Sequence, residues 1–296
     1  MSVTYTHDWQ ADGIAERNLE LTTTAQFVRY SALERAQVAR LLALPLDPDA
    51  DLPERDTCKL YDLTVDLGEQ GGLEQSETAT VDLLEAGDLT VETSGNTLKL
   101  EPRHFPGLLP FISGVAYGEA QNNHAAKSGR VHVSASGGDA VGAFRVDAAS
   151  PQLPRIGELA GQRPTHEPTL ASEQRLNLDW AKAGDTRLDE DVLYIEARVP
   201  SATKRDLVLR CSPHDDGTFT IGRADLSNLI RNKRGRLVIE LVRLRRTFFA
   251  ARGLDSGELR IAVRDRTSLE LRYQLTGPSC AKDAESQRRS EKGACW

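Results

Sequence analysis

Apolar and polar residues alternate along much of this chain. In residues 130–135, Val131, Val133 and Ala135 are apolar, and the residues between them are Arg, His and Ser. Residues 191–199 repeat the pattern. Because a period of two puts successive side chains on opposite faces of a strand, both segments are predicted to be half-buried β-strands.

Strands of this type recur in two series, from residue 59 to 148 and from residue 171 to 276. Ser94, Gly95 and Asn96 supply the positive-φ residues of a tight hairpin inside the first series. Short strands separated by turns are typical of sandwiches. The predicted fold class is mostly β, with two antiparallel β-sandwich (Ig-like) modules.

A short N-terminal helix is also expected. Residues 19–30 are rich in β-branched and aromatic residues and predict a strand. In the segment that follows, Ser31 and Glu34 match a capping box, and Ala, Leu, Arg and Gln favour helix. We therefore predict a helix over residues 32–43, which Pro45 ends.

The domain boundary is predicted from prolines. Residues 149–170 contain four of them and no sustained period, as in a linker. The expected organisation is an N-terminal segment 1–57 packing on the first domain, a first β-sandwich 58–150, a Pro-rich linker 151–170, a second β-sandwich 171–276 and a disordered tail 277–296.

Composition limits the partners. The chain has 296 residues and a net charge of −7, which argues against nucleic acid. No apolar run reaches about 18 residues, so no membrane span is predicted. The first ten residues lack a basic region followed by an apolar stretch, so no signal peptide is predicted. The mature part of an exported precursor would also lack a signal peptide, whether or not the precursor carried a lipid anchor.

The cysteines indicate the compartment. Cys58, Cys211, Cys280 and Cys295 are disulfide candidates, and four cysteines allow three pairings. Pairing Cys280 with Cys295 would close a loop of about 15 residues, worth about 3 kcal/mol in the chain-entropy model. Cys211 alternates with apolar residues, so it is either a core residue or a disulfide partner, with Cys58 as one candidate. At least one disulfide, and therefore an oxidising, extracytoplasmic compartment, is expected.

Two motifs resemble metal sites but lack residues that those sites need. Cys211 and His214 lie three apart, yet zinc needs two more ligands, and the segment PHDDG is predicted to be the tip of a hairpin. The alternating aspartates of residues 47–51 resemble the start of an EF-hand loop, but Leu52 and Cys58 stand where glycine and glutamate belong. We expect neither a metal nor a cofactor.

Catalytic motifs are also lacking. The six histidines are scattered, and no HExxH, GxSxG, P-loop or GxGxxG occurs. Carboxylates can meet in space, so a polysaccharide hydrolase with an unrecognised carboxylate pair stays an alternative. Asp189, Glu190 and Asp191 are interpreted as solvated turn charges. No catalytic residue is assigned.

A basic cluster is the candidate binding site. Eight cations lie within 22 residues, with only Glu240 opposing them: Arg231, Lys233, Arg234, Arg236, Arg243, Arg245, Arg246 and Arg252. The planar fork of arginine suits carboxylate, sulfate or phosphate. The cluster is therefore either a site for an anionic ligand or a sheet face whose arginines pair with acidic neighbours.

Several phrases together resemble one group of proteins. They are VDLLEAGDLTVETSGNTLKLEPRHFPGLLPFISGVAYG, GAFRVDAASP, LNLDWAKAG, DVLYIEARV and VLRCSPHDDGTFTIGRADLSNLI, over roughly residues 58–265. The chain resembles exported proteins and lipoproteins of myxobacteria and their relatives, although Gly222 replaces a proline usual in the group. The resemblance implies two β-sandwich modules, export and surface attachment, and transfers no catalytic residue.

The expected function is that of a non-enzymatic extracytoplasmic protein, in the periplasm or at the cell surface. It would bind an envelope glycan, another envelope component or a partner protein. A structural component whose sheet edges pair with neighbours is the alternative. The oligomeric state is left open.

Overall fold

The computed structural model describes residues 1–8, 19–42, 44–63, 79–94, 96–104, 112–122, 129–164, 168–171, 175–184, 191–200, 207–230 and 235–272. Most of these residues lie in strands, so the prediction of a mostly β protein is confirmed. The predicted disordered tail 277–296 lies outside the described residues, as do Cys280 and Cys295.

One long sheet runs through the whole described molecule. Ten of its strands follow the order β3 (Val28–Ser31), β5 (Thr80–Leu83), β9 (Ile112–Asn122), β2 (Leu19–Ala25), β1 (Ser2–Asp8), β19 (Gly257–Arg272), β18 (Arg236–Phe249), β15 (Asp191–Arg198), β16 (Leu207–Cys211) and β4 (Cys58–Asp62). Two short strands join it, β13 (Thr169–Ala171) beside β19 and β8 (Pro102–His104) beside β9.

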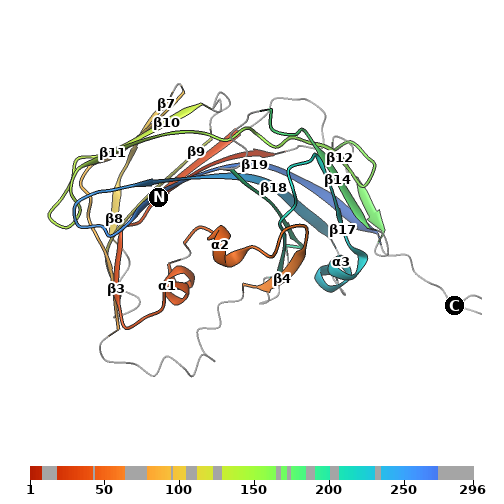
Figure 1. Ribbon diagram of the computed structural model, residues 1–296, viewed down its shortest axis with the longest axis horizontal. Helices are drawn as coiled ribbons and strands as arrows, with labels where there is room; N and C mark the ends of the chain where they lie inside the picture. Colours follow the sequence, from red (N-terminus) through yellow and green to blue (C-terminus); the bar gives the residue numbers. More distant parts are fainter. Residues whose placement is uncertain are drawn as a thin grey trace, which may run out of the picture.

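Two smaller sheets cover one face of the long sheet. They are β11 (Phe144–Ala149), β10 (Arg130–Ala135), β6 (Leu89–Thr93) and β7 (Asn96–Leu100), and β12 (Ile156–Leu159), β14 (Leu176–Trp180) and β17 (Thr218–Ile221). Figure 1 shows the long sheet as an arch, with the smaller sheets on its convex side.

Each smaller sheet forms its own hydrophobic core with the long sheet. Val131 of β10 packs in one core with Ile261 of β19. Leu178 of β14 packs in the other core with Ile239 of β18 and Leu269 of β19. Strand β19 therefore contributes to both cores, and the two pairs of packed sheets share one sheet.

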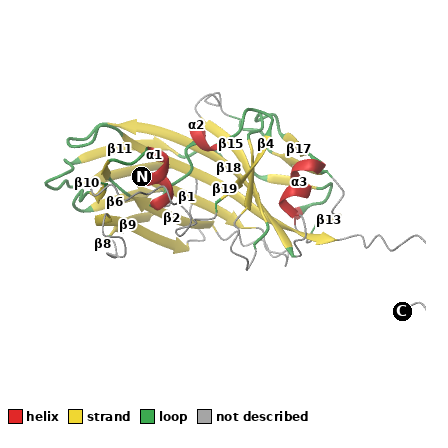
Figure 2. Ribbon diagram, turned by 90° about the horizontal axis from the view of Figure 1, so that it is seen from below, coloured by secondary structure: helices red, strands yellow, loops and turns green. Residues whose placement is uncertain are grey.

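The concave side of the arch is crossed by residues 32–42 and 44–57, here called the strap. The strap connects β3 to β4, which lie at opposite ends of the strand order, and contains helices α1 (Arg35–Leu41) and α2 (Pro48–Asp51). Both helices lie beneath the arch in Figure 1 and in front of the strands in Figure 2. Leu46 and Leu52 pack against even-numbered positions of the long strands, such as Val242. Even-numbered residues of β18 and β19 thus face the strap.

Several elements differ from the sequence predictions. The chain begins with strands, and the short helix α1 follows three of them. Residues 151–170, expected to form a linker, contain β12 and the start of β13. Prolines do not prevent this, because they are tolerated beside short edge strands. Cys58–Asp62, expected to open the first sandwich, instead pairs with β16.

Helix α3 (Arg223–Ile230) follows β17 directly. Its residues Leu226 and Leu229 are buried in the core beneath β14 and β16. None of the described helices is long and apolar enough to cross a membrane.

Candidate anion-binding site

The structure does not gather the predicted basic residues on one face. Arg231, Lys233 and Arg234 lie outside the described residues. Arg236 is exposed at the start of β18, and Arg252 is exposed in the turn after it. Their role in anion binding stays a prediction.

The side chains of Arg243 and Arg245 point to the convex side, where they form hydrogen bonds beneath the smaller sheets. Arg243 is fully buried; its Nη2 donates to Asp215 Oδ2 at 2.6 Å and its Nη1 to the Gln152 carbonyl at 2.7 Å. Arg245 makes a bidentate pair with Asp191, from Nε at 2.6 Å and Nη2 at 2.9 Å. Asp191 is therefore a buried partner and not the solvated charge expected.

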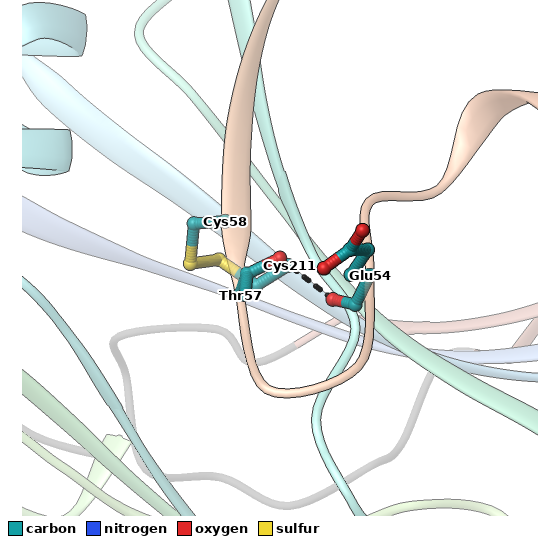
Figure 3. Close-up of a disulfide and its surroundings, with 4 residues drawn as sticks. All are labelled: Glu54, Thr57, Cys58 and Cys211. Atoms are coloured by element: carbon teal, nitrogen blue, oxygen red, sulfur yellow. Dashed lines mark hydrogen bonds between the residues drawn. A yellow bond between two sulfur atoms is a disulfide. The ribbon is translucent and has the colours of Figure 1, made fainter.

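The disulfide answers the question raised by Cys211 and His214. Cys211 is bonded to Cys58, its direct neighbour across β16 and β4. Figure 3 shows this bond beside the turn that enters β4, where the Thr57 hydroxyl donates to the Glu54 carbonyl at 2.6 Å. His214 Nδ1 lies 2.5 Å from an Asp56 carboxylate oxygen.

This arrangement uses both side chains of the suspected metal pair in other contacts. Within the described part of the chain, no group of three or more His, Cys, Asp or Glu side chains is placed to hold a metal.

A different arginine cluster assembles on the concave side. The Glu240 cluster consists of Glu240, Arg198, Arg264 and Arg266, from strands β18, β15 and β19. Glu240 Oε1 accepts from Arg198 Nη2 at 3.0 Å and from Arg266 Nε at 2.9 Å, and Glu240 Oε2 accepts from Arg264 Nη1 at 3.2 Å. Three guanidinium groups thus converge on one carboxylate.

Sheet register explains this convergence. Six charged residues on the concave face lie side by side across six neighbouring strands: Lys59, Arg210, Glu196, Glu240, Arg266 and Asp8. Arg210 pairs with Glu196 at 2.8 Å, and Arg266 lies 3.4 Å from Asp8. Neighbouring strands lie about 4.8 Å apart, so each residue in this row is within reach of the next.

The Glu240 cluster carries surplus positive charge at the surface. Glu240 has a side-chain exposure of 2%, whereas Arg198, Arg264 and Arg266 retain 45%, 30% and 33%. Among the described residues, Asp8 is the only second carboxylate paired with these arginines. Burial raises the pKa of Asp8, and Arg266 opposes that rise. The buried carboxylate holds the guanidinium groups in place, and the partly exposed side chains can direct further N–H donors to an anion.

A second arginine cluster on the same face is built in the same way. The Glu258 cluster consists of Glu258, Arg246 and Arg260. Glu258 accepts from Arg246 Nε at 2.5 Å and from Arg260 Nη2 at 2.8 Å. Burial alone would raise the pKa of Glu258, but hydrogen bonds from the two arginines lower it overall.

The strap covers the Glu258 cluster. Arg246 Nη1 donates to Asp49 Oδ2 at 2.6 Å. Arg260 Nη1 donates to the carbonyls of Pro45 at 2.7 Å and Leu46 at 2.6 Å. The predicted binding residue Arg246 is thus engaged by the acidic motif that resembled an EF-hand.

No family model, no curated protein and no solved structure matches this chain. The resemblance to exported myxobacterial proteins therefore stays an expectation. Sequence reasoning missed Arg198, Arg264 and Arg266. Arg264 and Arg266 are two apart in a strand and so share a face, which was the available signal; Arg198 joins them only through strand pairing.

Proposed function

We propose that this protein is a non-enzymatic, extracytoplasmic binding protein that holds an acidic group of an envelope glycan or partner on the concave side of its long sheet. The observation that carries the proposal is the convergence of three partly exposed guanidinium groups on buried Glu240. The buried carboxylate fixes the arginines before a ligand arrives, which reduces the ordering cost of binding.

The disulfide supports the proposed compartment. Cys58 and Cys211 are bonded although 153 positions separate them in the sequence. Such bonds persist in oxidising environments and are rare in the cytosol, which supports an extracytoplasmic location. Export also agrees with the group of proteins that the sequence resembles. The cores between the long sheet and each smaller sheet support a description as two β-sandwich layers that share a sheet.

One observation favours a second candidate, a polysaccharide hydrolase. Asp8 is a half-buried carboxyl group whose pKa is raised by burial, and Glu20 and Glu240 raise it further. A carboxyl group whose pKa is raised is better suited to act as a general acid than an ordinary carboxylate. Chromatographic analysis of acidic polysaccharides after incubation tests this candidate, and release of shortened chains would favour it over simple binding.

The binding proposal is tested with a fluorescent polyuronate and with neutral dextran as the matched control. We expect binding of the polyuronate only, with an affinity that falls as ionic strength rises, because surface charges are screened by salt. Arg198→Ser should weaken binding about tenfold, the effect of losing roughly 1.4 kcal/mol. Arg198 is the most exposed arginine of the cluster, so this variant should remain folded.

Arg29→Ser is the control variant. Arg29 is exposed on β3, at the far edge of the long sheet, and its loss changes the net charge by the same amount. Equal losses in Arg198→Ser and Arg29→Ser would show that only overall charge matters. That result would remove the Glu240 cluster as the site.

A further inference from the structure

The two arginine clusters of the concave face differ in one respect. Each gathers guanidinium groups around one glutamate of a long strand, which is buried in the case of Glu240 and partly exposed in the case of Glu258. The Glu258 cluster is covered by the strap, and its Arg246 and Arg260 retain side-chain exposures of only 18% and 10%. The Glu240 cluster has no such cover among the described residues, and each of its arginines is more exposed than Arg246 or Arg260. The groups that bind the covered Glu258 cluster therefore indicate which groups the open Glu240 cluster can bind.

The strap provides a particular set of acceptors. One aspartate carboxylate, from Asp49, binds Arg246, and two consecutive backbone carbonyls, of Pro45 and Leu46, bind Arg260. The side chains of Leu46 and Leu52 pack on the apolar patch beside these arginines. A carboxylate, adjacent peptide carbonyls and an apolar side chain together are the chemistry of an acidic polypeptide.

The surroundings of the open cluster accept the same three groups. Its partly exposed guanidinium groups suit a carboxylate and carbonyl oxygens. Val238, the neighbour of Glu240 on this face of β18, is partly exposed and supplies apolar surface. A phosphate group would also accept hydrogen bonds from the guanidinium groups, but it would leave the apolar surface uncovered.

We infer that the Glu240 cluster binds an extended, aspartate-rich polypeptide segment of a partner protein, as the Glu258 cluster binds the strap. This inference rests on the proposed function and names its ligand. The carboxylate would contact Arg198 and Arg264, and neighbouring backbone carbonyls would take the remaining guanidinium donors. The negative charge of the aspartates would balance the surplus positive charge of the Glu240 cluster.

The experiment uses the full chain and a labelled peptide with the strap sequence of residues 44–53, LPLDPDADLP. Its control is LPLNPNANLP, which keeps shape and apolar residues but lacks the carboxylates. Fluorescence anisotropy should show salt-sensitive binding of the acidic peptide and at least tenfold weaker binding of the control. Arg198→Ser should weaken binding of the acidic peptide about tenfold, and Arg29→Ser should leave it unchanged.

Three further results are informative. Loss of binding in Arg246→Ser but not in Arg198→Ser would show that the peptide only exchanges with the strap, and would overturn the inference. Binding of polyuronate or inorganic phosphate at Arg198, without binding of the peptide, would overturn the inference and leave the proposed function intact. If none of the three probes binds in an Arg198-dependent manner, both proposals fall.

Discussion

Glu240 shows how a single buried residue organises a charged surface. Its carboxylate accepts hydrogen bonds from three arginines and has almost no exposure to water. A buried charge is tolerated when it is paired and hydrogen-bonded, and removing one partner leaves the other charges uncompensated. The sequence presents Glu240 only as the single acid among eight cations. Its partners come instead from β15 and β19, a relation that no sequence spacing reveals.

Glu240→Gln should therefore destabilise the fold by about 2–3 kcal/mol, less than loss of a fully buried pair because the arginines can still reach water. Urea denaturation measures the change in the free energy of unfolding. Glu92→Gln, at an exposed position of β6, is the matched control and should change it by less than about 0.5 kcal/mol. Similar values for the two variants would contradict the role given to Glu240.

Buried tyrosines give a prediction at alkaline pH. Burial raises the pKa of Tyr5 to about 12, and complete burial raises the pKa of Tyr194 above its ordinary value. A raised folded-state pKa gives stability that is fully present below the unfolded value of 10.0 and is lost as pH rises towards 12. Phenolate absorbance should therefore rise later in the folded protein than in urea. Coincident titration curves would show that these phenols are accessible to solvent.

At the scale of elements, the sequence predicts strands better than it predicts their partners. Val131, Val133 and Ala135 alternate as predicted, and their side chains are buried. The predicted hairpin around Ser94 is confirmed by the pairing of Thr93 with Asn96. A period of two specifies which face of a strand is buried, but it is silent on the neighbouring strand. For this reason β4 could not be placed beside β16 from the pattern alone.

The end of the strap depends on the disulfide. Strand β4 is a five-residue edge strand that pairs with β16 alone among the described strands. The bond between Cys58 and Cys211 holds it there and closes a long loop in the unfolded chain. Replacing both cysteines by alanine should cost about 2–4 kcal/mol.

Hydrogen exchange locates that loss. Amides of residues 58–62 should exchange much faster in the double alanine variant, whereas amides of β10, in the other core, should change only through the loss of global stability. Unchanged protection of residues 58–62 would show that strand pairing holds β4 without the covalent bond.

At the scale of the whole molecule, the long strands β18 and β19 connect the two halves and are expected to couple their unfolding. The sequence predicts two sandwiches separated by a linker, because two series of strands flank a proline-rich stretch. The structure places β18 and β19, of 14 and 16 residues, across both halves. A period of two specifies the faces of a strand, but it does not indicate that one strand contributes to two cores.

This sharing predicts that both halves unfold together. Leu178 of β14 is fully buried in the core beneath the three-stranded sheet, so Leu178→Ala should cost about 2–5 kcal/mol. If β18 and β19 couple the halves, the free energy of opening measured by hydrogen exchange should fall equally in β14 and in distant β10. Lys99→Ala, at an exposed position of β7, should change neither. A fall confined to β14 would instead mean that the cores unfold independently and that the molecule behaves as two domains joined by a continuous sheet.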